Sequence, residues 1–493
     1  MNLRLFGQNA IIYTIGSTVL RFTAFLMLPL YTHYLTKSDF GLFQTLLLTI
    51  QIMITIVDVG IRSGIVRFLS EYEKTNKLKK LLGSALAINL LSGILLILAS
   101  LTILVPIFRL MVPQGDITLL IFLTSLAAVF QTLSINIMAY YRARNEGLKY
   151  IVFSIAAALI LVLSNIVFLI LLKMNLEGAL FAQVITYSLV WIAASIIIFS
   201  KHGIAVSKST VQKLFKFGAP LVFAMSGDLI TNTTAVYLLT YFRGLEAVAV
   251  YALAFKIAQI ANMSVIGPFQ MAYEPFVFAH KDDPEIKKTI ASLLSYLLIV
   301  YAIVSFGIVY LFRDLTAIIF SNSYTDSYLL LFLILPGMGF MGLQYVAQSL
   351  LHINNKTHIT GITIASVTLV SLFLNYFFIK MWGIYGIILT YNIIMTGTAL
   401  ILLAFGMKVF PVKFELKRFL IGGTIFVLLL STVFILRNTP AFIFYPVPML
   451  LFAVIVFYLL TGKFFDSEEK TFLNEYLSKT GLPLSFRKSI GLV

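Results

Sequence analysis

The stretch YLTKSDFGLF at residues 34–43 returns later in the chain as YFRGLEAVAVY at residues 241–251. Each copy is a short acidic segment, flanked by aromatic residues, that separates two long apolar runs. Three more pairs follow at nearly the same spacing, about 207 to 210 residues: YYRARNEGLKY at 140–150 with LLHINNKTHIT at 350–360, LSNIVFLIL at 163–171 with FLNYFFIK at 373–380, and NLEGALFAQVITY at 175–187 with WGIYGIILTYNI at 382–393. Four matches in the same order indicate an internal repeat that relates two halves of the chain.

The composition is that of a polytopic membrane protein. Of 493 residues, 60% are hydrophobic and only 11% are charged, and the mean hydropathy is +0.98. Soluble domains average about 45–50% apolar and about 25% charged residues. A helix that crosses a bilayer needs about 20 apolar residues. Fourteen such runs are predicted: 9–34, 41–69, 81–105, 117–141, 150–172, 177–200, 218–242, 247–279, 289–312, 327–352, 359–379, 383–406, 419–436 and 442–461.

The repeat pairs the first six spans with the next six. Because six is even, both halves start on the same side of the membrane, and they are predicted to be parallel repeats about an axis along the membrane normal. Two such lobes around a central cavity form a transporter architecture, with the substrate site at the lobe interface. The expected fold is therefore all-α, with lobes at 1–205 and 206–410, two added helices at 411–461 and a tail at 462–493.

Basic residues predict the orientation. The loops that follow even-numbered spans hold 19 Lys and Arg residues, and those that follow odd-numbered spans hold 7. Cytoplasmic loops carry the excess of Lys and Arg, so both termini and the even loops are predicted to be cytoplasmic in the plasma membrane. The same rule explains the net charge of +16 without a nucleic-acid partner. The first run exceeds the roughly 7–15 apolar residues of a cleaved signal, so a retained helix is expected.

Several kinds of chemistry have no motif in this chain. There is no cysteine, no GxxxxGK[ST] stretch for ATP and no GxSxG nucleophile elbow, and the five histidines lack metal-ligand spacing. No cofactor or metal is therefore expected. A membrane-embedded glycan polymerase or ligase is the main enzymatic alternative, but such enzymes usually carry catalytic groups on a sizeable external loop, and the outer loops here are short.

An arginine interrupts the first apolar run, GSTVLRFTAFLMLPLY at 16–31. Insertion of a central Arg costs roughly 2.5–3.5 kcal/mol, so such residues usually face protein or a wet cavity. The repeat aligns Arg21 with Asp228, so one copy carries a cation where the other carries an anion. Two interpretations stay open: an ion pair that holds the lobes together, or an anion site in which Arg21 leaves Asp228 when a phosphate arrives.

Two other spans, the second and the eighth, also carry charges. The repeat relates Arg67 to Glu274, which form either a cytoplasmic gate or two unrelated charges that extend to water. Lys256 lies far from the outer loop and is expected to face the cavity. A further pair, Asp58 and Arg62, is four residues apart in one span, so the two are expected to share a helix face and neutralise each other.

Amides are frequent within the predicted spans, which favours a hydrated interior that tolerates sugars, although some must join helices. Candidates for the glycan cavity are Asn165, Asn375, Gln259 and Asn262. The amides within the predicted spans are Gln44, Gln51, Asn89, Gln131, Asn136, Asn165, Gln183, Asn232, Gln259, Asn262, Gln344, Asn375 and Asn392.

Pro268 and the Glu274-Pro275 pair predict a break in the eighth span.

The chain resembles a known family at this point. LPLYTHYLTKSDFGLF at 28–43, DVGIRSGIVRFLSEY at 58–72 and the span starts LEGALFAQ and WGIYGIIL are similar to the polysaccharide biosynthesis proteins, the Wzx-type oligosaccharide flippases of the MOP superfamily. The resemblance covers essentially the whole chain. It implies a MATE-like fold and a 6+6+2 plan of helices.

The resemblance also implies a function. Such proteins move a polyprenyl-diphosphate-linked oligosaccharide to the outer leaflet for surface polysaccharides such as O-antigen, without enzymatic activity. Arg21 and Lys256 then suit the diphosphate, and the amides suit the glycan. Expected partners are this lipid, membrane lipid, H⁺ or Na⁺ as coupling ion, and polysaccharide assembly proteins. Alternatives are a lipid II flippase, whose first helix region typically has more arginines, and a MATE-like exporter, which typically has twelve helices.

Overall fold

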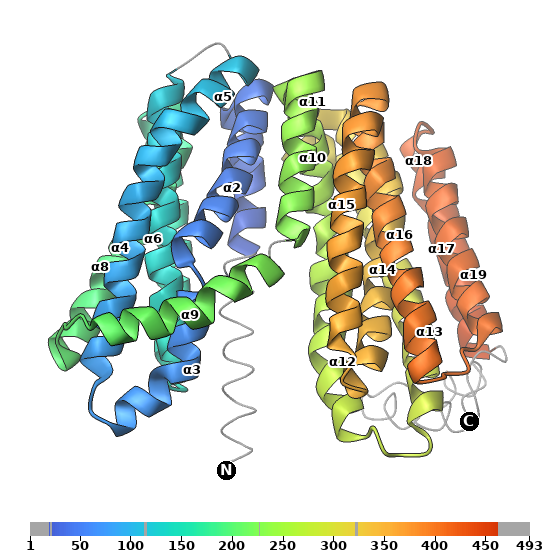
Figure 1. Cartoon of the computed structure of the whole chain (residues 1–493). Coiled ribbons are helices and arrows are strands. Elements are labelled where there is room, and N and C mark those ends of the chain that lie inside the picture. The colour runs from blue at the N-terminus through green and yellow to red at the C-terminus, as the bar shows by residue number, and fades with distance from the viewer. Residues whose placement is uncertain (1–18, 20–21, 113–115, 226, 321–323, 462–493) are drawn as a thin grey trace. The chain divides into compact units, whose positions relative to one another are not determined.

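The computed structural model of the chain describes residues 19, 22–112, 116–225, 227–320 and 324–461. Every regular element in these ranges is a helix (Figure 1). Residues 22–34 are helical. The helices that follow in the first part of the chain are α2 (Lys37–Asp58), α3 (Ile61–Lys74), α4 (Leu78–Ala99), η1 (Ser100–Leu104), α5 (Val105–Met111), α6 (Ile117–Ala143), α7 (Gly147–Asn165), η2 (Ile166–Leu171), α8 (Asn175–His202), α9 (Lys208–Met225) and α10 (Gly227–Arg243).

The second part of the chain continues in the same way. A helix satisfies its own backbone donors and acceptors, which is the condition for crossing a bilayer. The helices here are α11 (Leu245–Ala261), η3 (Asn262–Ile266), α12 (Gly267–Ala279), α13 (Ile286–Ile319), α14 (Thr325–Ile353), α15 (Thr357–Trp382), α16 (Ile384–Val409), α17 (Leu416–Leu436), α18 (Ala441–Phe444) and α19 (Pro446–Thr461).

The predicted all-helical membrane fold is confirmed. Within the described residues, twelve helical segments are long and apolar enough to cross a membrane, and each coincides with a predicted span. Of the predicted first span, 9–34, residue 19 and residues 22–34 are described, and 22–34 are helical. The seventh, 218–242, is divided between α9 and α10, and in Figure 1 α9 lies across α3 and α4. The tail at 462–493 also lies outside the described residues.

The chain forms two compact units. The first comprises Met1–Leu253, Ile319–Tyr324 and Ile364–Thr390, and the second comprises the remaining segments, Ala254–Ile318, Thr325–Thr363 and Tyr391–Val493. The first unit therefore includes helices from both predicted halves of the chain. The division into lobes at 205 and 410 concerns the internal repeat and stays a prediction.

The two copies of the repeated segment meet within the first unit. Thr36 caps α2, because its hydroxyl oxygen accepts the Asp39 N–H at 3.0 Å. Gly41, one turn further on, lies so close to α11 that an added Cβ would fall 1.9 Å from the Leu245 carbonyl oxygen and 3.3 Å from the Ala249 nitrogen. Glycine is required here because the backbones of two helices touch.

The second predicted span is interrupted between α2 and α3. Val59 and Gly60 both have positive φ, 46° and 74°, which ends one helix and starts the next. A Cβ on Gly60 would lie 2.4 Å from the carbonyl oxygen of Gly218 in α9, and one on Gly218 would lie 2.3 Å from that of Val59. The interruption is therefore packed directly against the backbone of α9.

The predicted break in the eighth span is wrong. Residues Leu245–Ala279 form one continuous helical segment, in which the π-turn η3 precedes Pro268. A wider turn accommodates a proline, which lacks an N–H and clashes with the preceding turn of an α-helix. Another π-turn, η1, precedes Pro106 in the same way. Pro275 lies inside α12 without ending it.

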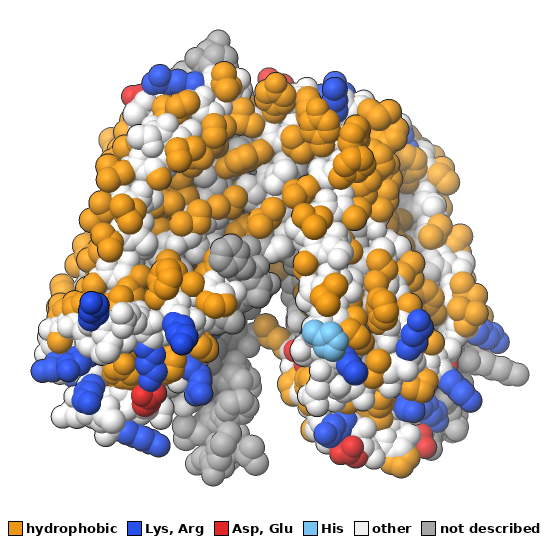
Figure 2. All heavy atoms as spheres, viewed as in Figure 1, with side chains coloured by type: hydrophobic (Ala, Val, Ile, Leu, Met, Phe, Trp, Pro, Cys, Tyr) orange, Lys and Arg blue, Asp and Glu red, His pale blue; other side chains and the backbone are white. Residues whose placement is uncertain are grey.

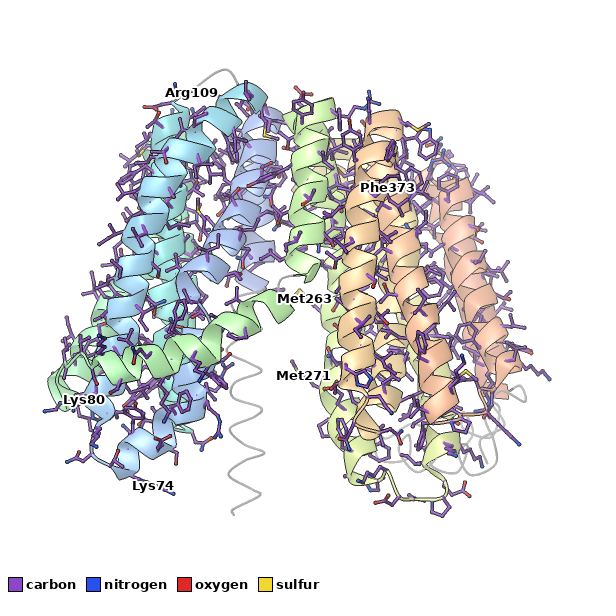
Figure 3. The ribbon with its side chains drawn as sticks, viewed as in Figure 1. Lys74, Lys80, Arg109, Met263, Met271 and Phe373 are labelled. Carbon is purple, nitrogen blue, oxygen red and sulfur yellow. The ribbon has the colours of Figure 1, made fainter. Side chains whose placement is uncertain are left out.

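Apolar side chains cover the middle of each unit and basic ones gather at its ends (Figure 2). Leu91, Leu95 and Leu98 of α4 are each more than half exposed, at helical spacing, which marks a face that contacts lipid. In the first unit, Lys74 and Lys80 lie at the end opposite to Arg109 (Figure 3). The loops predicted to lie on opposite membrane sides thus occupy opposite ends of this unit.

We predict that Gly60→Ala destabilises the protein far more than Gly244→Ala. Both glycines have a positive φ, 74° and 81°, so either substitution costs about 1–2 kcal/mol of backbone strain. Only at Gly60 does the new methyl group meet backbone atoms, which adds about 1–3 kcal/mol. At Gly244 no atom lies within 4 Å of it. Thermal unfolding of the purified variants measures the difference, and equal melting temperatures would contradict the packing of α9 on the interruption.

Candidate functional site

The interruption between α2 and α3 is surrounded by buried polar groups. The carbonyl of Val57, near the end of α2, accepts hydrogen bonds from Asn89 Nδ2 and Ser92 Oγ of α4, both at 2.9 Å. The carboxylate of Asp58, which is 7% exposed, accepts the backbone N–H of Arg62 at 3.1 Å. Side chains thus replace helical hydrogen bonds lost where the helix stops.

The predicted shared helix face of Asp58 and Arg62 is not present. Asp58 is the last residue of α2 and Arg62 belongs to α3, because the positive φ of Val59 and Gly60 separates the helices. The contact is a bond from the Arg62 backbone N–H to the Asp58 carboxylate, at the start of α3. An acidic group at a helix N-terminus is favoured by the helix dipole.

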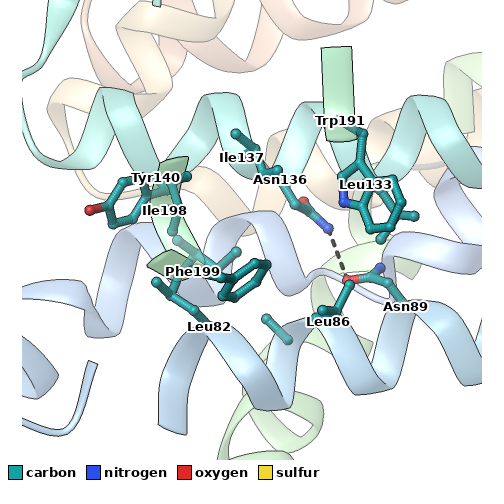
Figure 4. Close-up of a pocket in the computed structure, with 12 residues that line it drawn as sticks. Leu82, Leu86, Asn89, Leu133, Asn136, Ile137, Tyr140, Trp191, Ile198 and Phe199 are labelled. Atoms are coloured by element: carbon teal, nitrogen blue, oxygen red, sulfur yellow. Dashed lines mark hydrogen bonds between the residues drawn. The ribbon is translucent and has the colours of Figure 1, made fainter. Parts of the chain in front are cut away.

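A small cavity extends from this polar group into the first unit (Figure 4). Asn136 Nδ2 of α6 donates to Asn89 Oδ1 at 3.1 Å, and both side chains line a space of about 40 Å³ together with Leu133 and Trp191. The Oδ1 atom of Asn136 is buried and has no partner among the described residues. A space of this size, bordered by two amides of which one has an unpartnered oxygen among the described residues, suits ordered water.

Helix α9 is fastened to α3 beside this interruption. The Lys213 ammonium lies 2.6 Å from Glu71 and 4.5 Å from the ring centroid of Phe68. Tyr72 donates to the Thr210 hydroxyl at 3.1 Å. Leu214, on the same helix, is fully buried in the core formed with α3, α4, α6 and α8. These contacts hold α9 across α3 and α4.

Lys256 lies in the second unit, within the continuous span Leu245–Ala279. Its side chain is half-buried, and no described carboxylate lies within 4.0 Å of its ammonium. The neighbouring Phe255 packs edge-on against Tyr391 of α16, with ring centroids 5.5 Å apart. Among the described residues, a charge in this position has no ion pair of the kind that usually accompanies an intramembrane cation.

The turn after Lys256 is fixed by a sulfur atom. Met341 Sδ of α14 accepts a hydrogen bond from Asn262 Nδ2 at 3.3 Å and another from the Tyr391 hydroxyl at 3.7 Å. Asn262 is the first residue of the π-turn η3 and is half-buried, whereas Gln259 is exposed. The two predicted amides thus lie about one turn and nearly two turns beyond Lys256, and they differ in their surroundings.

Asn165 and Asn375 are buried, at 0% and 1% exposure. Asn165 Nδ2 donates to the Leu161 carbonyl at 2.8 Å, immediately before the π-turn η2. Its Oδ1 atom and the Nδ2 atom of Asn375 have no partner among the described residues. Their assignment to a glycan cavity stays a prediction.

The remaining predicted residues are placed only in part. Arg21 lies outside the described residues, and Asp228 is in α10, but its side chain is not described. Arg67 is exposed on α3 of the first unit, and Glu274 is half-buried on α12 of the second. The proposed central pair and the proposed gate therefore stay predictions.

The pairing of Asn89 with Asn136 is the main feature that the sequence did not indicate. Both amides fall within predicted spans, but they are distant in sequence and share no motif. The Val59-Gly60 dipeptide was the available signal for an interruption, because Gly is the residue that most readily adopts positive φ.

Solved structures with similar folds define the class of protein. The lipid II flippase MurJ, in an inward closed conformation, has a TM-score of 0.72 and 16% identity, covering 91% of this chain and 99% of that one. An inward-facing multidrug resistance MATE family transporter of the MOP superfamily has a TM-score of 0.63 and 14% identity, with 79% and 94% covered. The chain has the fold of the MOP superfamily.

A match at the level of sequence gives the family. The model described as "Polysaccharide biosynthesis protein" matches residues 6–280, more than half of the chain, and the chain belongs to this family. An uncharacterized membrane protein of Methanocaldococcus jannaschii is 24% identical over 251 residues, covering 46% of this chain. That match spans 49% of the relative, about half its length.

We predict that Asn89→Leu lowers the free energy of unfolding by about 1–2 kcal/mol, more than Asn136→Leu does. Asn89→Leu removes two hydrogen bonds, the one to the Val57 carbonyl and the one from Asn136. Asn136→Leu removes the bond between the two amides and a hydrogen bond to the Asp58 carboxylate, which still accepts the backbone N–H groups of Arg62 and Gly60. Thermal unfolding in detergent compares the variants, and an equal or reversed order would show that the Val57 carbonyl does not depend on Asn89.

Proposed function

We propose that the protein is a flippase that moves a polyprenyl-diphosphate-linked oligosaccharide across the cytoplasmic membrane by alternating access. Lys256 carries this proposal, because it is a cation inside a membrane span with no described carboxylate within 4.0 Å. Holding such a charge in the membrane costs roughly 2.5–3.5 kcal/mol unless water or an anion compensates it. A diphosphate that passes through the membrane supplies that anion.

The family and the fold support this class of activity. The chain is a polysaccharide biosynthesis protein, and one structure of similar fold is that of a lipid II flippase. In the proposed mechanism, Lys256 and Arg21 bind the diphosphate, and Asp228 holds Arg21 while the site is empty. Arg67 and Glu274 close the cytoplasmic side, and intramembrane amides contact the glycan. The protein acts as a transporter, with no catalytic residue.

The proposed orientation places both termini in the cytoplasm. An ion gradient, of H⁺ or Na⁺, then drives the cycle, since the chain has no ATP-binding motif. A potential that is negative inside also favours outward transfer of an anionic head group, by about 2.3 kcal/mol per charge per 100 mV. Lipid II or another lipid-linked glycan would use the same groups, and the experiment below compares such substrates.

We predict that Lys256→Gln slows leaflet exchange of a fluorescent polyprenyl-diphosphate oligosaccharide in proteoliposomes by about tenfold or more. The substitution keeps a hydrogen-bond donor but removes the charge, and a charged hydrogen bond is worth about 1.5–3 kcal/mol. Arg21→Ala is expected to act in the same direction. Quenching of the outer-leaflet fluorophore measures the rate, with wild type and lipid II analogues in parallel.

Lys413→Gln is the matched control, because Lys413 is exposed in the segment between α16 and α17. This substitution removes the same charge at a position outside every described span, and the variant should keep the wild-type rate of leaflet exchange. Equal rates for Lys256→Gln and Lys413→Gln would remove the diphosphate role of Lys256. If wild type exchanges no lipid-linked glycan but changes its chain length, the protein is a polymerase or ligase instead.

A further inference from the structure

A polar pocket of about 390 Å³ lies in the second unit, where α13 ends, α14 begins and α17 ends. Arg313 and Asp314 come from α13, Asp326 and Tyr328 from the first turn of α14, and Arg437 directly follows α17. Leu329 is the one aliphatic side chain in the lining, which otherwise consists of charged, hydroxyl and amide groups and the Tyr328 ring. The volume is in the range of small-molecule sites.

Arg313 is held firmly in this lining. Its Nη2 atom donates to the Thr439 carbonyl at 2.8 Å, its Nε atom lies 3.5 Å from Asp314, and its guanidinium stacks 4.0 Å from the ring centroid of Phe444. The remaining nitrogen, Nη1, is buried and has no partner among the described residues. A preorganised guanidinium with an unused donor is suited to a ligand that accepts a hydrogen bond.

The rest of the lining offers both donors and acceptors. Tyr328 is 6% exposed, and its hydroxyl has no partner among the described residues. Asp314 accepts a hydrogen bond from Tyr445, and Asp326 is exposed with no ion pair to a described residue. Arg437 Nη1 donates to the Phe434 carbonyl at 2.7 Å, and its guanidinium lies 4.0 Å from the centroid of the Phe434 ring.

The mixture of charges determines the kind of ligand. Two carboxylates repel a simple anion, and two guanidiniums repel a simple cation. A saccharide carries hydroxyl groups that both donate and accept, so it can use the guanidinium, carboxylate and phenol groups together. The pocket lies at helix ends that border predicted outer loops, after α13 and after α17.

We infer that this pocket binds a sugar residue of the transported glycan on the outer side of the membrane. The inference rests on the proposed function and adds a contact for the glycan that is separate from the diphosphate residues Lys256 and Arg21. A glycan contact at the outer ends of the helices would hold the head group as it leaves the membrane interior.

The experiment is saturation-transfer NMR on the full chain in detergent. The probes are methyl glycosides of glucose, galactose, rhamnose, N-acetylglucosamine and glucuronic acid, with inorganic phosphate as a separate probe. We expect transfer to at least one glycoside. We expect binding to weaken at least fivefold in Asp326→Asn, an exposed site where folding is not at risk, and in Arg437→Gln. Arg243→Gln is the matched control, because Arg243 likewise donates to carbonyls at a helix end, those of Lys380 and Met381, but lies in the first unit.

Three results would overturn the inference: no transfer to any glycoside, equal transfer in all variants, or binding of phosphate alone, which would make the pocket an anion site. Leaflet exchange measured on the same preparations separates the two proposals. Sugar binding without exchange in wild type would refute the flippase and keep the pocket, whereas exchange without sugar binding would refute the pocket and keep the flippase.

Discussion

The rest of the first unit depends on one constraint: a backbone carbonyl inside a membrane must find a donor within the protein. The end of α2 presents such a carbonyl, on Val57, and Asn89 and Ser92 of α4 supply the donors. This pair of bonds fixes α4 beside the interruption, and the bond from Asn136 then fixes α6 beside α4. A defect in one helix therefore determines how three helices pack.

Close backbone contact is the second element of this packing. Lipid is as apolar as a leucine side chain, so helices in a membrane associate through close fit and hydrogen bonds rather than through exclusion of water. Gly60 and Gly218 let α9 rest on the interruption, and Gly41 does the same for α2 against α11. Polar contacts add specificity: Lys213 pairs with Glu71 between α9 and α3, and the Thr49 and Tyr237 hydroxyls lie 2.6 Å apart between α2 and α10.

The spans were predictable because length and hydropathy alone define them, and the twelve described spans coincide with predicted runs. Local backbone geometry was less predictable. Pro268 predicts a break, but the π-turn before it keeps the helix continuous, while the actual interruption at Val59-Gly60 has no proline. The partners of Asn89 and Asn136 depend on contacts between distant parts of the chain, which no local pattern encodes. Lys256 and Asn262 could be named as candidates from the sequence because a polar side chain in a membrane span is costly by itself, and their roles stay predictions.

The basic residues of the structure differ in how they are compensated, and that difference bears on function. Arg144 lies 3.1 Å from Glu73 and 3.3 Å from Glu146, and the hydrogen bond with Tyr140 raises the pKa of its guanidinium. Lys213 has a carboxylate and two aromatic rings. Lys256, inside a span, has no described carboxylate within 4.0 Å. Folding alone would favour a neutral side chain at this position, because the charge costs free energy and the described residues return no ion pair. In the proposed function, the diphosphate of the substrate supplies the opposite charge at this position.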